Sequence, residues 1–309
     1  MEYTKQRAAS LWICQARDRR LGGDTARQIA ICKCGHTRRG SHPAIFEGKI
    51  GEIEMTVREL YAFLEEKMPR ALSCDWDNDG LMVCPDDTKE VRRVLVALDI
   101  TAAVAEHAVG EGYDLVISHH PLIFHPLKAV APGEATVNKV IRLLTSGVSA
   151  MSFHTRLDAV GGGVNDVLAK AVGLCDVVPF GKDGEEIGRI GTLPTKMTLK
   201  EFAAFVKEVT GATYVQISDA GKPVSRVAVL GGGGAGESGA AAAAGADTYL
   251  TGDLRHDQLT EAPERGMNLV QGGHFFTENL VCDRIREMLH EADATIKVDI
   301  INSYPAEFV

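Results

Sequence analysis

The stretch VRRVLVALDITAAVAEHAVGEGYDLVISHH, residues 91–120, decides the fold class of this chain. Its apolar run over 91–100 predicts a buried strand, the alanine-rich segment over 101–110 predicts a helix, and 113–120 predicts a second strand. The same alternation continues in strand-like segments at 147–155, 187–192 and 213–218 and in helix-like segments at 138–146, 164–173 and 198–211. Alternation at this spacing predicts an α/β fold with at least partly parallel sheets.

The deciding stretch has an echo later in the chain. RVLVALD (93–99) and GYDLVISHH (112–120) are matched, 133 residues on, by RVAVLGG (226–232) and GADTYLTGD (245–253). Each unit reads as a strand, a small-residue helix, Gly-x-Asp and a second strand that ends in polar residues. Two similar α/β halves facing each other across a cleft would explain the echo, and chance similarity between two βαβ units is the alternative.

Composition and charge narrow the class of protein. Hydrophobic residues make up 45% and charged residues 24% of the 309 residues, which is typical of a globular chain. The net charge is −9, and because residues 1–54 carry +4 the rest carries −13, which argues against a broad basic face for nucleic acid. No apolar run approaches the ~18 residues that span a bilayer, and the N-terminus does not resemble a signal peptide. We therefore expect a cytoplasmic protein with no membrane contact.

The first 54 residues differ from the remainder because they lack sustained apolar periodicity. Cys32, Cys34, His36 and His42 could be taken for a zinc site, but C-x-C-x-H is not a common structural zinc spacing. We expect a poorly ordered extension over 1–54. An amphipathic helix follows from Met55, with Thr56 and Glu59 spaced as a capping box.

Polar side chains that metals prefer gather where the predicted strands end. Open α/β sheets bind their ligands at the carboxyl ends of the strands. Imidazole and carboxylate groups together are the donors that zinc, manganese and iron prefer. Three histidines with two carboxylates exceed what one catalytic ion needs and suit two ions that share a bridge. The alternative is that each histidine is simply a hydrogen-bonded strand-end residue. The residues that gather there are His119, His120, His154, Asp158, His274 and Glu278, and the count of three histidines leaves out His154, which is not required as a ligand.

Five blocks of the sequence resemble the GTP cyclohydrolase 1 type 2 family, also called the Nif-three-like dinuclear metal centre proteins. The resemblance spans about residues 55–309, with the blocks in family order. The blocks are DNDGLMV (77–83), GYDLVISHHPLIFHPLK (112–128), SFHTRLDAVGGGVNDVLA (152–169), YLTGDLRH (249–256) and GGHFFTE (272–278).

The resemblance implies a fold, a ligand set and an assembly. It implies two interlinked α/β domains of similar topology with a dinuclear metal site in the cleft, and a toroidal homohexamer. We expect the poorly ordered extension at 1–54, the metal-binding α/β domain at 55–180, the second α/β domain at 181–270, and a C-terminal helix and strand at 271–309 that return to the first domain. The two divalent ions, zinc, manganese or iron, are expected on His119, His120, Asp158, His274 and Glu278.

Three functional hypotheses follow. The first is a dinuclear-metal hydrolase acting on a purine nucleotide, with His154 as a proton shuttle and His256 in reserve. The second is a non-catalytic metal-binding or regulatory ring. The third is a nucleotide-binding oxidoreductase, because Gly231, Gly233 and Gly236 satisfy G-x-G-x-x-G and Asp253 follows. We favour instead a tight glycine turn whose free N–H groups hold a phosphate near the metals, with Asp253 and His256 supporting the site.

A chain that begins at Met55 should fold and assemble as the full chain does, because residues 1–54 supply no core pattern. Thermal unfolding and sedimentation of the two chains provide the measurement. Aggregation of the shorter chain, or loss of its thermal transition, would show that the extension is structural.

Overall fold

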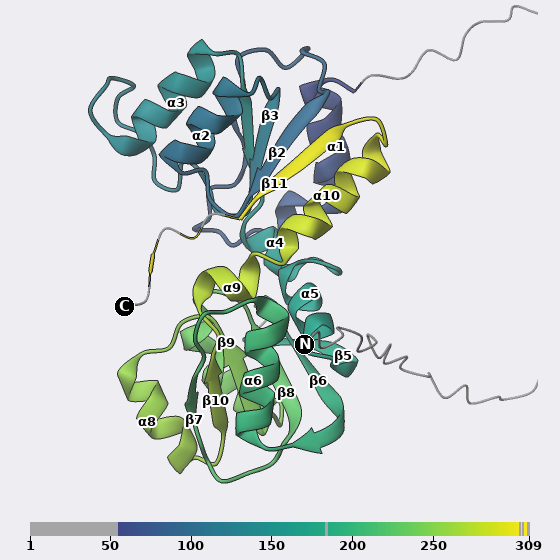
Figure 1. Cartoon of the computed structure of the whole chain (residues 1–309), viewed down its shortest axis with the longest axis vertical. Helices are drawn as coiled ribbons and strands as arrows, with labels where there is room; N and C mark the ends of the chain where they lie inside the picture. The colour runs from purple at the N-terminus through teal and green to yellow at the C-terminus, as the bar shows by residue number, and fades with distance from the viewer. Residues whose placement is uncertain (1–54, 183–184, 303, 305, 308–309) are drawn as a thin grey trace, which may run out of the picture. The chain divides into compact units, whose positions relative to one another are not determined.

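Two mixed β-sheets with helices packed on their faces form the described part of this protein (Figure 1). The computed structural model describes residues 55–182, 185–302, 304 and 306–307, so our expectations for residues 1–54 lie outside the described residues. The first sheet has the strand order β1-β4-β3-β2-β11, and the second has β5-β6-β8-β9-β10-β7. The predicted α/β class with two interlinked units is confirmed.

The first sheet is covered by helices on both faces (Figure 1). Successive residues of β2 point to opposite faces, so Val94 packs in one core with α1 and α10, and Leu95 packs in another with α2 and α3. The strands are β1 (Gly80–Val83), β2 (Arg93–Ala97), β3 (Leu115–Ser118), β4 (Ser149–Ser152) and β11 (Lys297–Ile301). The helices are α1 (Val57–Lys67), α2 (Ala102–Gly110), α3 (Ala135–Thr145) and α10 (Val281–Ala292), and the short turn η1 (Arg70–Leu72) follows α1.

Helix α1 begins with the predicted capping box. The Glu59 N–H donates to Thr56 Oγ1 at 3.3 Å, and the Thr56 N–H donates to Glu59 Oε2 at 2.9 Å. These bonds satisfy amide groups that the first turn of a helix leaves unpaired.

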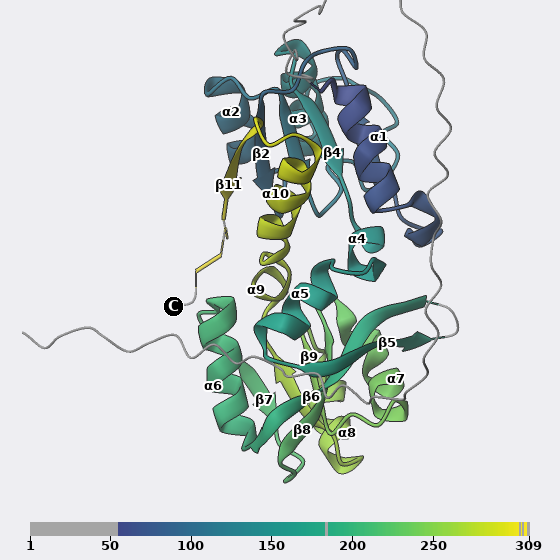
Figure 2. The ribbon, with the colours of Figure 1, turned by 90° about the vertical axis from the view of Figure 1, so that its right-hand side faces the viewer.

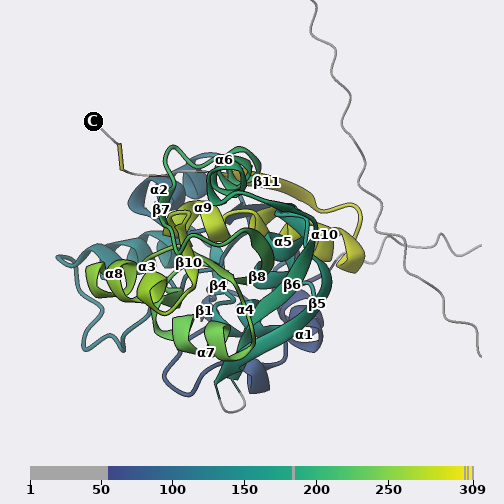
Figure 3. The same ribbon diagram turned by 90° about the horizontal axis from the view of Figure 1, so that it is seen from below.

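The second sheet is also covered on both faces, by α5 and α6 on one and by α7 and α8 on the other. Figure 3 shows α6 and α7 on opposite sides of it. Its strands are β5 (Cys175–Lys182), β6 (Glu185–Met197), β7 (Gln216–Ser218), β8 (Val224–Leu230), β9 (Thr248–Thr251) and β10 (Asn268–Gln271). Its helices are α5 (Val164–Ala171), α6 (Leu199–Thr210), η2 (Gly234–Glu237), α7 (Ser238–Ala243) and α8 (His256–Glu264). None of the helices in the described ranges is long and apolar enough to cross a membrane.

The chain leaves the first sheet after β4 and returns to it at the end. Two short helices, α4 (Thr155–Ala159) and α9 (His274–Glu278), lie between the sheets (Figure 2). From α9 the chain continues into α10 and then into β11, which pairs in parallel with β2. The two sheets are therefore interlinked, because the first one is completed by the last strand of the chain.

The sequence echo corresponds to a repeated parallel unit in the two sheets. Val94 pairs with Leu115 between β2 and β3, and Val227 pairs with Thr248 between β8 and β9, so the pairs keep the offset of 133. In each unit the carboxylate of Gly-x-Asp accepts hydrogen bonds from two consecutive N–H groups where the first strand begins. The bonds to Asp114 come from residues 92–93, and those to Asp247 come from residues 225–226.

Replacing either aspartate by alanine should lower the free energy of unfolding by about 1.5–3 kcal/mol, because each accepts charge-assisted bonds from backbone N–H groups. Urea unfolding of Asp114→Ala and Asp247→Ala measures the loss, with Glu208→Ala on the exposed side of α6 as the control.

Burial raises the pKa of Asp114, but the Arg92 N–H and Lys89 outweigh burial and lower that pKa overall. The stabilisation by Asp114 should therefore be present above pH ~4, its unfolded pKa, and be lost as the pH falls. Equal stability of both variants and the control would contradict the assignment.

Candidate metal centre

The carboxyl ends of the central strands of both sheets supply the predicted site residues. His119 and His120 follow β3 directly, whereas β4 leads through His154, the N-cap residue of α4, to Asp158 within that helix. From the second sheet, β10 leads to α9, which carries His274 and Glu278 four residues apart. The structure brings all six predicted residues together from these three segments.

The ligand atoms form overlapping groups of three in which all members lie within 4.8 Å of one another. His120 and His274 share Glu278, with Nε2 atoms 3.0 and 3.2 Å from its Oε2. His119 Nε2 lies 3.7 Å from Asp158 Oδ1 and 3.8 Å from Glu278 Oε1. A third group joins His119, His120 and His154. Glu278 thus belongs to two separate triads, whereas His256 is exposed at the start of α8 and belongs to none of the three groups.

Each of the four imidazoles is held from behind through its Nδ1 atom. An oxygen lies within hydrogen-bond distance of every Nδ1, which leaves every Nε2 for the centre. Such backing by carboxylate or carbonyl oxygen fixes the tautomer and the ring orientation of metal-binding histidines. The four contacts are His119 to Phe153 O at 2.9 Å, His120 to Asp99 at 2.8 Å, His154 to Asp77 at 2.9 Å and His274 to Asp253 at 2.6 Å.

Two buried atoms at the middle of the group make no hydrogen bond, namely His119 Nε2 and Glu278 Oε2, although Oε2 lies within ion-pair distance of the His120 and His274 Nε2 atoms. Since His119 Nδ1 faces a carbonyl oxygen and must donate to it, Nε2 presents a lone pair to the carboxylates of Asp158 and Glu278. Acceptors that face one another in a buried site need a proton or a cation between them. Nitrogen and carboxylate donors fit zinc, manganese or iron, so the residues present fit a metal centre.

The pKa shifts of the imidazoles also show that positive charge is stabilised at this position. Burial acts to lower the pKa of His120, but the carboxylates of Asp99 and Glu278 outweigh burial and raise this pKa to about 10. His274 behaves alike, because Glu278 overcomes burial and raises its pKa to about 9. Burial acts to raise the pKa of Glu278, yet the surrounding imidazoles hold it well below its usual range. Burial dominates at Asp158 and raises its pKa to about 7. A bound metal would displace protons from these imidazoles.

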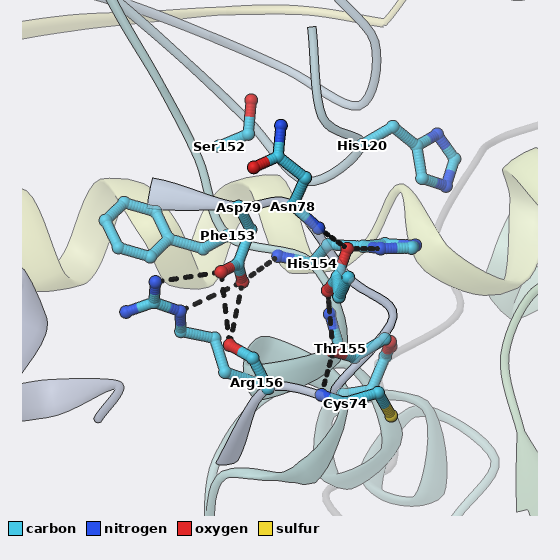
Figure 4. A network of polar contacts seen from close by, with 12 residues as sticks. Cys74, Asn78, Asp79, His120, Ser152, Phe153, His154, Thr155 and Arg156 are labelled. Carbon is cyan, nitrogen blue, oxygen red and sulfur yellow. Dashed lines mark hydrogen bonds and ion pairs between the residues drawn. The ribbon is translucent and has the colours of Figure 1, made fainter. Parts of the chain in front are cut away.

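The turn over 77–79 supports the segment that carries His154 and Asp158, a role that the sequence pattern did not reveal (Figure 4). Asp77 accepts from the Thr155 N–H at 3.0 Å and the Thr155 hydroxyl at 2.6 Å. Asp79 accepts from the His154 N–H at 3.2 Å, and its two oxygens bind the fully buried guanidinium of Arg156 at 2.8 and 2.9 Å. The DNDGL block contains both aspartates, but only the folded chain shows that they bind the residues around His154.

The glycine turn after β8 packs against the centre. The Gly231 N–H donates to Asn165 Oδ1 at 2.8 Å and the Gly232 N–H donates to Thr277 Oγ1 at 3.1 Å. A Cβ on Gly232 would lie 1.9 Å from Glu278 Oε1. Our expectation that this turn offers free N–H groups to a phosphate is therefore wrong for these two residues. The dinucleotide hypothesis also loses its acidic residue, because Asp253 contacts His274.

Two α/β sheets that direct histidines and carboxylates into one buried group define an α/β protein with a centre suited to divalent metals. The sequence pattern of the Duf34/NIF3 (NGG1p interacting factor 3) family matches residues 55–306. The chain belongs to this family.

Relatives and solved structures agree with this membership. A GTP cyclohydrolase 1 type 2 homolog of Nostoc sp. is 37% identical over 240 residues, covering 76% of this chain and 91% of the relative. A protein NIF3 homolog of Schizosaccharomyces pombe is 30% identical over 256 residues, again covering 76% and 91%. The crystal structure of a Staphylococcus aureus hypothetical protein has a TM-score of 0.75 at 26% identity, covering 83% of this chain and 100% of that one. Reduced HcgD from Methanocaldococcus jannaschii has a TM-score of 0.70 at 28% identity, covering 81% and 99%.

Gly232→Ala should reduce the metal content of the purified protein while leaving the circular dichroism spectrum intact, because the new Cβ displaces the Glu278 carboxylate. Gly239→Ala in α7 is the matched control, since nothing lies within 4 Å of a Cβ there. Elemental analysis after saturation with metal compares the two variants. Full metal content in Gly232→Ala would contradict the central place of Glu278.

Proposed function

We propose that this protein is a metal-dependent hydrolase that binds two divalent ions through His119, His120, Asp158, His274 and Glu278. The supporting observation is the Glu278 carboxylate, which is shared by two triads and has a buried, unpartnered oxygen. One triad would bind each ion, with Glu278 as the bridge. Purine nucleotides are the proposed substrate class, because relatives carry the name GTP cyclohydrolase 1 type 2 homolog.

When bound, a pair of divalent ions would lower the pKa of a water molecule and would polarise, through its oxygen, the carbonyl or phosphoryl group that the water attacks. The chain's own contribution begins with orientation, because Asp99 and Asp253 hold the rings of His120 and His274 in place. The carboxylates of Asp99 and Asp253 also favour cations over anions at this position. Removal of these carboxylates should weaken metal binding more than it lowers the stability of the fold.

His154 is the proposed proton carrier. Its Nδ1–H donates to Asp77, which leaves Nε2 to accept a proton from the attacking water and to pass it to the leaving atom. Burial opposes the charge on Asp77, but hydrogen bonds from His154 and Thr155 keep its pKa well below the usual range. Asp77 therefore stays ionised and stabilises the imidazolium that forms when His154 takes up the proton.

The same ligands would also serve a non-catalytic metal-binding or regulatory ring, so turnover rather than metal content separates the two functions. The toroidal homohexamer and the cytoplasmic location belong to this proposal as well. The mass of the protein in solution, measured by sedimentation, tests the hexamer directly.

We expect about two transition-metal ions per chain after metal saturation. Asp158→Ala, His120→Ala, His274→Ala and Glu278→Ala should lose metal and hydrolytic activity together. His154→Ala should keep the metal and lose ~10²–10⁴-fold in rate, the range of general acid–base groups. Metal content and the rate of nucleotide hydrolysis, with products read by mass, are measured side by side.

Three outcomes would overturn parts of this assignment. A metal content of zero in the unmodified protein removes the site. If His154→Ala loses metal as fully as His120→Ala, then His154 is a ligand, as its place in the group with His119 and His120 also permits. If metal is bound and no nucleotide is hydrolysed, the non-catalytic function stands instead.

A further inference from the structure

Two large aromatic side chains are exposed beside His154. Trp76 keeps 61% of its residue surface exposed and Phe124 keeps 40%. The ring centres of both lie close to the His154 imidazole, at 6.0 Å for Trp76 and 6.1 Å for Phe124, and 6.1 Å separates them from each other. All three pairs meet edge to face at angles of 67–84°, so no two of these rings are stacked. The exposed apolar surface is therefore continuous with the candidate centre.

The segments that carry these rings are fixed to each other. Asn78 Nδ2 donates to the Ile123 carbonyl at 2.5 Å, which ties the turn after Trp76 to the loop before Phe124. On the other side of Trp76, the Cys74 N–H donates to Thr155 Oγ1 at 2.9 Å, and the Asp77 N–H donates to the Cys74 carbonyl at 3.0 Å. The two ends of the turn that carries Trp76, Cys74 and Asp77, therefore both bind Thr155, the residue after His154. The backbone on which the indole stands is thus in place before any ligand arrives.

We propose that Trp76 and Phe124 form the subsite for a planar heteroaromatic ring of the substrate, and that they select compounds that carry such a ring. Exposed apolar side chains that adjoin one another, as Trp76 and Phe124 do, can mark a ligand-binding groove, whereas single scattered ones are ordinary surface. Aromatic side chains bind bases by stacking, which tolerates different bases because every base has a π face. The adjoining His154 and carboxylates then face the polar edge of the ring, where nitrogen and carbon atoms can react.

The proposal rests on the proposed function, because it places the substrate ring against the same centre. It goes further in naming the part of the substrate that is recognised: the flat heterocycle is bound by Trp76 and Phe124. Compounds that share the sugar and phosphate but lack the ring should therefore bind poorly.

Fluorescence of Trp76 provides a direct readout of stacking. The chain has two tryptophans, Trp12 and Trp76, so a full-length Trp12→Phe variant reports on Trp76 alone. Guanosine 5′-monophosphate and adenosine 5′-monophosphate should each quench this emission in a saturable way. Ribose 5-phosphate, which has the same phosphate and sugar without the base, should not. Equal quenching by ribose 5-phosphate would overturn the subsite.

Substitutions test whether aromatic character matters. By calorimetry, Trp76→Leu and Phe124→Ala should bind guanosine 5′-monophosphate about tenfold to a hundredfold more weakly, the range for loss of one stacked base. Trp76→Phe should restore most of the affinity, and Leu144→Ala is the control because Leu144 is exposed to the same 40% as Phe124. Metal content should be unchanged in all four variants. Equal affinity of Trp76→Leu and Trp76→Phe for the nucleotide would contradict stacking. Dissociation of the assembly in Trp76→Leu would also overturn the subsite, because it would assign the rings to an interface between copies.

Failure of this subsite can be told apart from failure of the proposed function. If nucleotide quenches Trp76 and needs the aromatic rings but is never hydrolysed, the subsite stands and the hydrolase does not. If the protein hydrolyses nucleotides while Trp76→Leu and the control have the same KM and kcat, the hydrolase stands and the subsite is wrong.

Discussion

The site depends on the buried carboxylate of Glu278. Its oxygens lie 3.0–3.8 Å from the Nε2 atoms of the adjacent His119 and His120 and of His274, which lies more than 150 residues further along the chain. A buried carboxylate with one unpartnered oxygen is costly unless positive charge lies beside it. Protons on the imidazoles or a metal ion can supply that charge. The surrounding backbone is shaped to keep the carboxylate in place, since Gly232 leaves room that any side chain would fill.

Carboxylates that lie behind the imidazoles and beneath the His154 segment make this arrangement rigid. Asp77, Asp99 and Asp253 each lie behind one imidazole, and Asp79 with Arg156 anchors the segment that carries His154. The guanidinium of Arg156 is fully buried and also donates to the Met68 carbonyl at 3.0 Å, at the end of α1. Arg156 thereby connects the first helix of the described chain, through Met68 and an ion pair with Glu65, to Asp79 and the candidate centre.

The repeated parallel unit explains why the two halves contribute differently. At the offset of 133, Asp99 and His120 of the first unit correspond to Gly232 and Asp253 of the second. In the first unit these positions hold a supporting carboxylate and a candidate ligand. In the second unit, Gly232 leaves room for the Glu278 carboxylate and Asp253 supports the ring of His274. Two copies of one scaffold, facing each other with their strand ends, thus build one site from complementary parts.

The α/β alternation, the capping box of α1 and the repeated unit could be predicted from sequence alone, because these features depend on local periodicity and spacing. The sequence also singled out the residues that converge, since polar groups at the ends of parallel strands share one edge of a sheet. Only the tertiary structure decided which oxygen lies behind which ring, that the glycine turn packs against Glu278, and that Trp76 and Phe124 flank His154. Those relations join residues up to about 80 positions apart in the chain, such as Asp77 and His154. They depend on how the segments pack in three dimensions, which no local pattern encodes.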